Sequence, residues 1–585
     1  MSLGDSRLIG RVRHVRGATV TVELDESLAG VTPLWEGRLH PIGQVGSLVE
    51  IPQGPVKLLA SVTLVGIAEL SGALEPSAAV QVGDRWLQVQ LLGEVDGLGR
   101  FQRGVSTYPG LDDPVHFTTP AELRAIFPAP GPDHVRLGTL ASAPDVAVAL
   151  TAQALVMRHG AIVGSTGSGK TSAVASLLQS FVRDGWSSAN VVVIDPHGEY
   201  AKAVEASATV RSVLGTGNKM LRVPFWALPA GDILRAFCGR EESATLQNRF
   251  SELVTLARQN FVSSAAWVKL KPTDVSADTP VPFDLNEVWY RLDYDNKATY
   301  SQGNGKGDAE IDEGGDVASL KPTRFKPYAM GSTAPFKGPM FGMYATAPDR
   351  LRLRLADPRF RFLLEPKGNS EGEDPLPDVI VEWLGNEKPV SVLDFSGVPS
   401  EATDLAVGLI LQMLFELCIR SRTKGIGRNR PVLVVLEEAH RYLGDSATTR
   451  AAKESANRIA REGRKYGIGL LLVTQRPSEL PDTALSQVGT IVALRLTNGT
   501  DQSTVKAALP DAVAGLAEAL PALRTGEAIV AGEAVTLPCR IQITRPNPRP
   551  EADDPSLDSW RMPPAKNDVK DAIARWRGSS VDGEA

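Results

Sequence analysis

Cysteine is scarce in this chain, with three residues in 585, at Cys238, Cys418 and Cys539. No two of them are close enough to form a Cys-x-x-Cys pair, so the sequence indicates neither a zinc site nor a disulfide framework. We expect three buried thiols, as in a protein of the reducing cytoplasm.

A long apolar run and an excess of positive charge are also absent. No stretch of 18 apolar residues occurs, and the N-terminal MSLGDSRLIG lacks the apolar segment of a signal peptide. We therefore expect a soluble, cytoplasmic protein without a membrane partner. The net charge of −6 argues against a globally basic nucleic-acid coat, so any basic footprint must be local.

The residues that are present predict two or three domains, because 43% of them are apolar and can form sizeable cores. Residues 1–120 contain short alternating runs broken by glycine and proline, which predict a small antiparallel barrel or sandwich. Beyond the proline-rich FPAPGP at 127–132, short β-branched or leucine-rich runs alternate with helical patterns. This predicts an α/β core over 135–261 and 376–545, with a mostly parallel sheet and helices on both faces.

Residues 262–375 interrupt this alternation and predict a partly helical inserted subdomain. Within it, QGNGKGDAEIDEGGD at 302–316 is glycine-rich and acidic, so we expect a mobile loop there. The proline-rich sequence after residue 545 predicts an extended C-terminal arm over 546–585. Its amphipathic stretch at 567–578 predicts a short helix that either docks on a neighbouring subunit or stays loose.

A phosphate-binding loop is predicted at 164–171, where GSTGSGKT follows the apolar run AIV and precedes a helical pattern. Its glycines allow successive N–H groups to turn inward around a phosphate, and the helix N-terminus adds partial positive charge. Lys170 would place a cation at the terminal phosphates, and Thr171 would offer its hydroxyl to Mg²⁺. We predict that a nucleoside triphosphate is bound by Gly164, Ser165, Thr166, Gly167, Ser168, Gly169, Lys170, Thr171 and Ser172.

The second half of such a site must hold the magnesium and activate water. PVLVVLEEAH at 431–440 is an apolar strand that ends in two carboxylates, the form of a Walker B strand. Glu437 would lie in the magnesium shell, where aspartate is usual, and Glu438 would polarise the attacking water as general base.

Other strands of a parallel sheet bring their carboxyl ends to the same edge. The strand IGLLLVTQ ends in Gln475, which we expect to sense the γ-phosphate, with a structural turn as the alternative. The strand NVVVID ends in Asp195 and is followed by His197 and Glu199, and we expect all three near the nucleotide or a coupling loop.

Residues 450–466 predict a helix with one apolar face, made of Ala452, Ala456, Ile459, Gly463 and Tyr466. Arg461 and Arg464 then point away from this face and could reach a neighbouring subunit. An arginine supplied across an interface contributes roughly 10³–10⁵ in rate to P-loop NTPases. A solvated basic face is the simpler alternative. The basic RSRTKGIGRNR at 420–430 either contacts DNA phosphates or is a solvated connection.

In their order along the chain, these motifs resemble those of the HerA family, hexameric ATPases of the HerA–FtsK branch of RecA-like motors. The match spans most of the chain. It includes the N-terminal barrel pattern, RHGAIVGSTGSGKTS (158–172), VVVIDPHGEY (191–200), VPFWAL (223–228), VLEEAH (435–440), RIAREGRKYG (458–467) and VTQRP (473–477). The chain departs from the family pattern in Glu437, usually aspartate, and in its long insertion.

The resemblance implies a ring of six identical subunits, with ATP and Mg²⁺ at the interfaces and double-stranded DNA in the channel. ATP hydrolysis would drive translocation or unwinding, and Arg158 matches a family arginine that reaches a neighbouring nucleotide. Relatives work with a NurA-type nuclease in DNA end processing, or in antiphage complexes with a nuclease or a sirtuin-like NAD-consuming effector. The alternative function is a nucleotide-gated ring scaffold that assembles and activates such an effector. A small-molecule kinase is disfavoured, because no acceptor-binding motif is evident.

Overall fold

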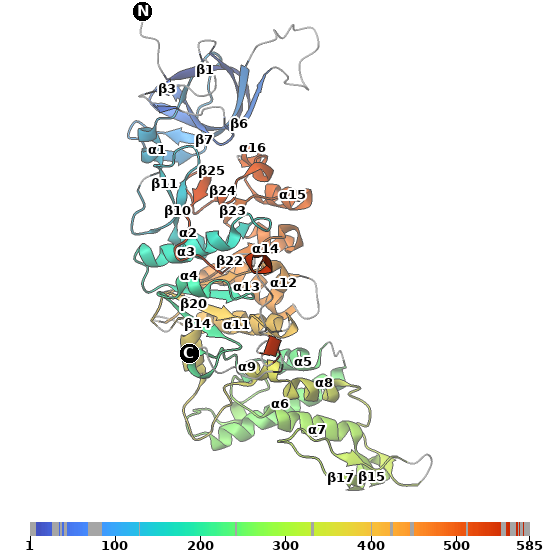
Figure 1. The fold of residues 1–585 in the computed structure, drawn as a ribbon. Coiled ribbons are helices and arrows are strands. Elements are labelled where there is room, and N and C mark those ends of the chain that lie inside the picture. The colour runs from blue at the N-terminus through green and yellow to red at the C-terminus, as the bar shows by residue number, and fades with distance from the viewer. Residues whose placement is uncertain are drawn as a thin grey trace, which may run out of the picture.

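A computed structural model of the chain arranges three regions one after another along its long axis (Figure 1). They are an N-terminal barrel, a large sheet covered by helices, and an inserted region. The structure describes all residues except 1–6, 26–27, 29–33, 36–37, 40–43, 68–84, 128, 240–242, 329–332, 386, 399, 422–424, 445–449, 511–512, 552–556, 562–568, 571–572, 574–576 and 578–585.

The N-terminal region is a closed barrel, which decides between the two predicted β folds. Six strands run in the order β2-β1-β9-β5-β6-β7, pairing of β2 with β7 closes the ring, and β8 extends β7. The bounds are β1 (Leu8–Arg16), β2 (Thr19–Leu24), β5 (Leu48–Gln53), β6 (Val56–Ile67), β7 (Arg85–Val95), β8 (Phe101–Arg103) and β9 (Pro114–Phe117), with a separate pair β3 (Leu34–Trp35) and β4 (Arg38–Leu39).

Residue alternation explains how the barrel joins the next region. On β6, Leu58, Ala60 and Val62 pack inside the barrel, whereas Leu59 packs into the core of the neighbouring sheet region. Helix α1 (Pro120–Ile126) follows the last barrel strand and begins with a capping box between Thr119 and Glu122.

The central region is a sheet of eleven strands in the order β11-β10-β25-β24-β23-β12-β22-β21-β13-β20-β14. The seven from β23 to β14 are parallel, and the four from β24 to β11 are antiparallel. The bounds are β10 (His134–Leu140), β11 (Ala147–Thr151), β12 (Gly160–Val163), β13 (Asn190–Asp195), β14 (Ala208–Ser212), β20 (Val390–Asp394), β21 (Val432–Leu436), β22 (Ile468–Thr474), β23 (Thr490–Leu494), β24 (Glu527–Gly532) and β25 (Cys539–Ile543).

Helices cover both faces of this sheet, so the predicted fold class is confirmed. Ile162 of β12 packs on one face with helix α3 (Lys170–Arg183), and Ala161 and Val163 pack on the other with α11 (Ser400–Arg420) and α13 (Arg450–Tyr466). The strands are buried on both sides, which explains their continuous apolar runs. The other helices of this region are α2 (Ala152–Met157), α4 (Ala201–Val204), α12 (Ala439–Leu443), α14 (Asp482–Ser486), α15 (Gly499–Ala508) and α16 (Ala514–Ala517).

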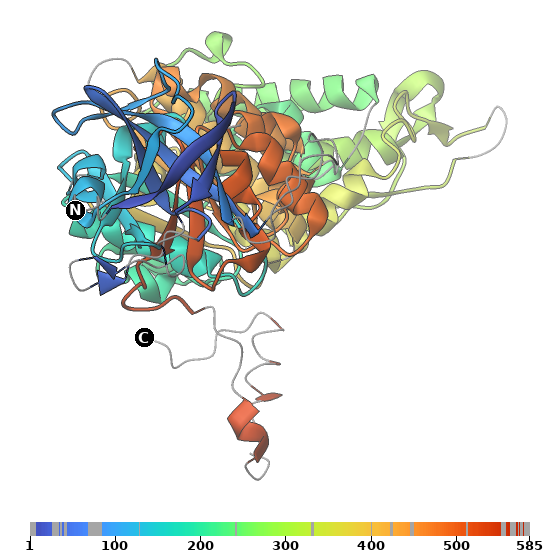
Figure 2. The same ribbon diagram turned by 90° about the horizontal axis from the view of Figure 1, so that it is seen from above.

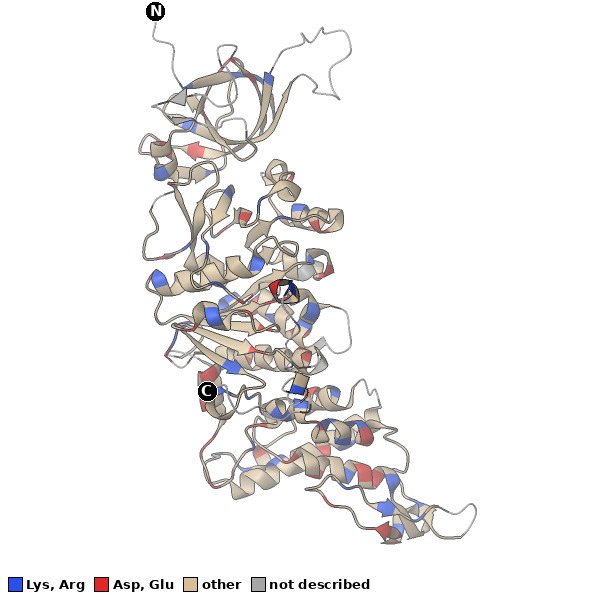
Figure 3. Ribbon diagram, viewed as in Figure 1, with Lys and Arg blue, Asp and Glu red and all other residues tan. Residues whose placement is uncertain are grey.

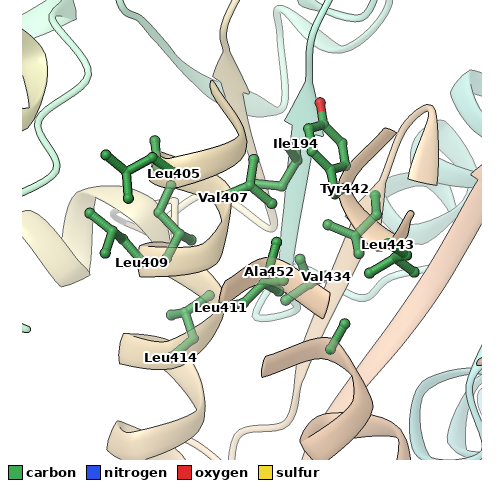
Figure 4. Packing of buried hydrophobic residues seen from close by; sticks show 14 of the residues in the cluster. Ile194, Leu405, Val407, Leu409, Leu411, Leu414, Val434, Tyr442, Leu443 and Ala452 are labelled. Atoms are coloured by element: carbon green, nitrogen blue, oxygen red, sulfur yellow. The ribbon is translucent and has the colours of Figure 1, made fainter. Parts of the chain in front are cut away.

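Helix α11 is long and apolar enough to cross a membrane by composition alone, over Ala402–Arg420. In this fold 78% of that apolar window is buried. Figure 4 shows Leu405, Leu409 and Leu411 of α11 in the same core as Ile194 of β13 and Val434 of β21. The apolar character of α11 is therefore accounted for by core packing.

The inserted region comprises the chain between β14 and β20 and projects beyond the sheet (Figure 2). It starts well before the predicted residue 262, because α5 (Ala230–Cys238) and α6 (Ala244–Ser264) already belong to it. Their amphipathic patterns resemble those of helices that cover a sheet, so the sequence offered no boundary. The remaining helices are α7 (Leu285–Lys297), α8 (Ala347–Ala356), α9 (Arg361–Leu364) and α10 (Leu376–Trp383).

The mobile loop expected at 302–316 is wrong for most of its length. The insertion contains two small antiparallel sheets, formed by β15 (Thr299–Gln302), β16 (Lys306–Ala309) and β19 (Phe336–Lys337), and by β17 (Ile311–Glu313) and β18 (Arg324–Phe325). Ion pairs join Lys321 to Glu313 at 2.6 Å and Lys326 to Glu310 at 2.8 Å. Two of the acidic residues that suggested a solvated loop, Glu310 and Glu313, thus have basic partners on either side of β18.

The C-terminal segment divides into two parts. Residues 544–551 lie on the sheet region, whereas the following turn η9 (Leu557–Arg561) extends away from the body (Figure 2). The short helix predicted at 567–578 lies largely outside the described residues.

Candidate functional site

A pocket of about 500 Å³ opens at the carboxyl ends of the parallel strands, where an α/β sheet places its ligands. It brings together parts of the chain that are far apart in sequence. The lining residues are Thr166, Gly167, Gly169, Lys170, Thr171, Ser172, Ala173, Glu199, Glu437, Glu438, Gln475, Thr525, Gly526, Gln542, Ile543, Thr544, Arg545, Pro546, Arg549 and Pro550.

The floor of the pocket is the predicted phosphate loop, which joins β12 to α3. Gly167 and Gly169 have φ angles of 72° and 101°, in the left-handed region that other residues rarely adopt. A Cβ on Gly169 would also lie 3.3 Å from the Gly526 nitrogen. Helix α3 begins at Lys170, so its N-terminal dipole and free N–H groups face the pocket.

Three residues that the sequence did not single out support this loop. Ser165 donates from its nitrogen and its hydroxyl to the Arg495 carbonyl, each at 2.9 Å. The Gly526 nitrogen donates to the Ser168 carbonyl at 3.0 Å, and the Thr525 hydroxyl donates to the Gly167 carbonyl at 3.4 Å. Arg495 follows a recognisable apolar strand at the same sheet edge, so the rule that pointed to Gln475 also points to it.

The two adjacent glutamates have different surroundings. Glu437 is 3% exposed, accepts a hydrogen bond from the Tyr200 hydroxyl at 2.7 Å, and has a pKa raised to about 8, chiefly by burial. Glu438 adopts a left-handed backbone with φ of 51°, which turns the chain between the two side chains.

The charge state of Glu438 suits a base. Burial alone would raise its pKa, but the nearby His440 and Lys170 outweigh that and leave the pKa lowered. His440 Nδ1 lies 3.2 Å from Glu438 Oε2. An ionised carboxylate next to a nearly neutral one is an arrangement in which the first can accept a proton.

The oxygen atoms of Thr171 and Glu437 are of the type that Mg²⁺ prefers. Within the described chain no cluster of three or more His, Cys, Asp or Glu residues could hold a metal by itself. A magnesium ion here would therefore be held by these two side chains together with phosphate and water oxygens, as is usual for nucleotide-bound Mg²⁺. The residues present fit that ion, which would neutralise charge on the phosphates.

Gln475 lines the pocket as expected and is tied to the phosphate loop. The Thr166 hydroxyl donates to its Oε1 at 2.7 Å. At the carboxyl end of β13, Glu199 lines the pocket, and the carboxylate of Asp195, the last residue of the strand, accepts hydrogen bonds from the nitrogens of His197, Gly198 and Tyr200. The pKa of Asp195 is raised to about 6, first by burial.

The three predicted arginines do not line the pocket. Arg158 precedes β12 and lies 3.3 Å from Glu533, while Arg461 and Arg464 lie near the end of α13, just before β22. Because β12 and β22 are parallel neighbours, all three arginines lie at the end of the sheet where the parallel strands begin. Four residues of β12, roughly 13 Å of strand, separate Arg158 from the phosphate loop.

His159 connects these positions. Its Nε2 lies 3.1 Å from the carbonyl oxygen of Ala460 on α13, and its Nδ1 accepts a hydrogen bond from the Leu470 nitrogen at 3.1 Å. The apolar face of α13 is as predicted, with Ala452, Ala456 and Ile459 buried. Arg461 and Arg464 are exposed, and neither has an ion pair within the described chain.

The basic stretch 420–430 lies at the same edge, with residues 422–424 outside the described part. The Arg428 side chain donates to the Lys465 carbonyl at the end of α13 at 2.9 Å. This places more positive charge beside Arg461 and Arg464.

Two family profiles match the chain. "Helicase HerA, central domain" matches residues 135–414, and "Helicase HerA-like C-terminal" matches residues 388–549. Together they cover residues 135–549, which include the phosphate loop, Glu437, Glu438 and the three arginines.

Curated relatives agree with this match. The DNA double-strand break repair helicase HerA of Pyrococcus furiosus is 26% identical over 489 residues, covering 78% of this chain and 76% of its own. The protein of the same name from Sulfurisphaera tokodaii is 27% identical over 465 residues, covering 79% of each chain. Among solved structures, VirB4 of Thermoanaerobacter pseudethanolicus aligns over 71% of this chain and 97% of its own, with 14% identity and a TM-score of 0.45. The chain belongs to the HerA helicase family and is an ATP-hydrolysing enzyme.

Proposed function

We propose that six copies of this chain form a ring that hydrolyses ATP with Mg²⁺ and translocates on, or unwinds, double-stranded DNA in the cytoplasm. One observation carries the proposal. The pocket has residues of the types that bind phosphate and activate water, whereas Arg158, Arg461 and Arg464 lie at the opposite end of the parallel strands. Arg461 and Arg464 are exposed, and Arg158 is half-buried beside Glu533.

In a ring, the end of the sheet that bears the arginines in one subunit can face the nucleotide pocket of the next subunit. An arginine at that position would neutralise charge that develops on the γ-phosphate during hydrolysis. In the pocket, Lys170 would bind the terminal phosphates, Glu438 would accept the proton of the attacking water, and Gln475 would respond to loss of the γ-phosphate. Thr171 and Glu437 would hold the magnesium.

DNA as the substrate is supported by the two relatives above, which are named as DNA double-strand break repair helicases. Basic and acidic residues are interspersed over the molecule (Figure 3). A DNA contact would therefore be a local basic cluster, such as residues 420–430. We further propose a protein partner, either a NurA-type or other nuclease in DNA end processing, or a nuclease or sirtuin-like effector in antiphage defence.

Steady-state ATPase assays with and without linear double-stranded DNA test the motor. We expect DNA to stimulate hydrolysis, and DNA binding to weaken steeply between 50 and 200 mM salt, as counterion release requires. Electron microscopy of the same sample should show closed rings. Equal rates with and without DNA, together with an absence of rings, would rule out this function.

A further inference from the structure

The outer wall of the pocket is built by the segment that follows the last strand of the sheet. Residues 542–550 contribute Gln542, Ile543, Thr544, Arg545, Pro546, Arg549 and Pro550 to the lining. The sequence predicted an arm leaving the core at this point, and no motif marks these residues as part of a nucleotide site.

Hydrogen bonds fix the path of this segment across the pocket. The Ile543 nitrogen donates to the Gly526 carbonyl at 2.9 Å, beside the phosphate loop. Further along, Gln179 of α3 accepts from the Asn547 nitrogen at 2.9 Å and donates to the Pro548 carbonyl at 2.8 Å. The Glu551 nitrogen then donates to the Glu199 carbonyl at 2.9 Å, at the far side of the pocket.

This path leads away from the phosphates. Gln179 lies nine residues after Lys170, which corresponds to about 13 Å along the axis of α3. The sugar and base of a nucleoside triphosphate bound at the start of α3 would lie away from the phosphate loop. The segment anchored at Gln179 is a wall of the same pocket, at a distance that suits the nucleoside end of the ligand.

The chemistry of the wall also suits a nucleoside. Pro546, Pro550 and Ile543 are buried, and their apolar side chains line the pocket. Arg545 and Arg549 line the same wall, and neither has a hydrogen bond or an ion pair within the described chain. A planar guanidinium stacks on an aromatic ring and is attracted to its π-system.

We propose that residues 542–550 form the nucleoside-binding wall of the ATP site, with Arg545 and Arg549 packing against the base. The inference rests on ATP as the nucleotide and not on DNA translocation. The wall would distinguish a nucleotide from a bare polyphosphate, because the phosphate loop contacts only the part that the two ligands share.

Isothermal titration calorimetry of the full-length protein with Mg²⁺ tests this, with ATP and inorganic tripolyphosphate as the two ligands. For the double variant Arg545→Ala/Arg549→Ala we expect the Kd for ATP to rise about tenfold, the size of effect expected for lost stacking. The Kd for tripolyphosphate should stay within about twofold. Gln179→Ala, which frees the segment without touching an arginine, should show the same selective loss.

Arg561→Ala is the matched control, because Arg561 is an exposed arginine of the same C-terminal segment outside the pocket. It should leave both affinities unchanged. An equal loss for ATP and tripolyphosphate would show that the arginines bind phosphate, and an unchanged ATP affinity in all variants would show that the wall binds nothing. Either result overturns the proposal. Failure of the wild-type protein to bind either ligand would instead contradict the ATP site itself, for which Lys170→Ala is the reference variant.

Discussion

Glu437 and Glu438 are neighbours in sequence, but their surroundings differ, and Glu438 adopts the left-handed backbone conformation at the turn from β21 into α12. Glu437 is buried against Tyr200 and its pKa is raised to about 8, first by burial, whereas Glu438 lies beside His440 and its pKa is lowered. The sequence shows the pair at the end of an apolar strand, and this was enough to predict both. It does not show Tyr200 or His440 as their partners, because these contacts depend on how the strands lie next to each other.

The different surroundings of the two glutamates predict how the Glu438→Gln substitution affects ATP hydrolysis and ATP binding. Glutamine keeps the shape of the side chain but cannot accept the proton of water, so we expect ATP hydrolysis to fall by at least about 100-fold. Binding of ATP should be unchanged within about twofold. Single-turnover hydrolysis and calorimetric binding measure the two quantities. A variant that retains more than a tenth of wild-type activity would exclude Glu438 as the general base.

The same variant separates the motor from the scaffold function. If rings of Glu438→Gln protein, which bind but do not hydrolyse ATP, retain full biological activity, occupancy alone is sufficient. Loss of activity in Glu438→Gln as well as Lys170→Ala rings favours the motor.

Glu122 gives a pH-dependent prediction at the barrel junction. Burial would raise its pKa, but hydrogen bonds from Lys57 at 2.5 Å, from Thr119 and from Arg7 outweigh burial and lower the pKa to about 2. A carboxyl whose pKa is lower in the folded state stabilises it above the unfolded pKa of 4.5 and loses that contribution as the pH falls toward 2.

We therefore expect Glu122→Gln to lower the stability at pH 7 by about 1–3 kcal/mol, reduced from the full shift because the side chain is partly exposed. The gap to the wild type should narrow as the pH falls below 4.5. Thermal unfolding of both proteins at pH 7, 4 and 3 measures this difference in stability. A gap that stays constant over this range would show that ionisation of Glu122 contributes nothing.

At the scale of elements, α13 shows how far a periodic pattern can be interpreted. Its buried face and exposed arginines were both predicted from spacing, because helical period alone determines them. The position of α13 beside Arg158 and residues 420–430 was not predicted, because the order of the strands is a property of the folded sheet.

The two faces of α13 should respond differently to truncation. Ile459 is fully buried, and Ile459→Ala should lower the free energy of unfolding by about 2–4 kcal/mol through the lost contacts and the cavity. Arg461→Ala removes an exposed side chain and should change it by less than about 0.5 kcal/mol. Urea unfolding followed by circular dichroism compares them. Equal destabilisation would contradict the assignment of the faces.

Other elements could not be predicted, for a physical reason that differs in each case. The phosphate loop and the strands on either side are encoded in short local motifs, so their residues were recognised. Residues 546–550 contain three prolines and were predicted to begin an extended arm. Instead, hydrogen bonds of Ile543, Asn547, Pro548 and Glu551 with Gly526, Gln179 and Glu199 fix this segment over the pocket. The start of the insertion was missed because α5 and α6 have the pattern of sheet-covering helices.

At the scale of the whole molecule, the pocket lies at the carboxyl ends of the parallel strands, and Arg158, Arg461 and Arg464 lie at their amino ends. We predict that Arg158→Ala, Arg461→Ala or Arg464→Ala rings with an ATPase defect regain activity when mixed with Lys170→Ala subunits. Interfaces that combine an intact Lys170 with an intact arginine would be restored. ATPase activity measured against the mixing ratio should pass through a maximum.

Arg458→Ala is the control on the same helix, because Arg458 lies 3.5 Å from Glu416 and stacks on Phe415 within its own subunit. A defect of that variant should not be complemented. If none of the three edge arginines shows a defect that mixing restores, they form a solvated face and catalysis in trans is excluded for them.

The placement of the insertion has a consequence for protein engineering. β14 and β20 are adjacent and parallel, so the chain leaving Ser212 must return to the opposite end of the sheet before it reaches Val390. Residues 213–389 therefore make up the whole crossover between two core strands, and are not a loop with nearby ends. A minimal motor could not be obtained by cutting them out and joining the ends directly. It would need a replacement connection of about a dozen residues or more, long enough to pass from one edge of the sheet to the other.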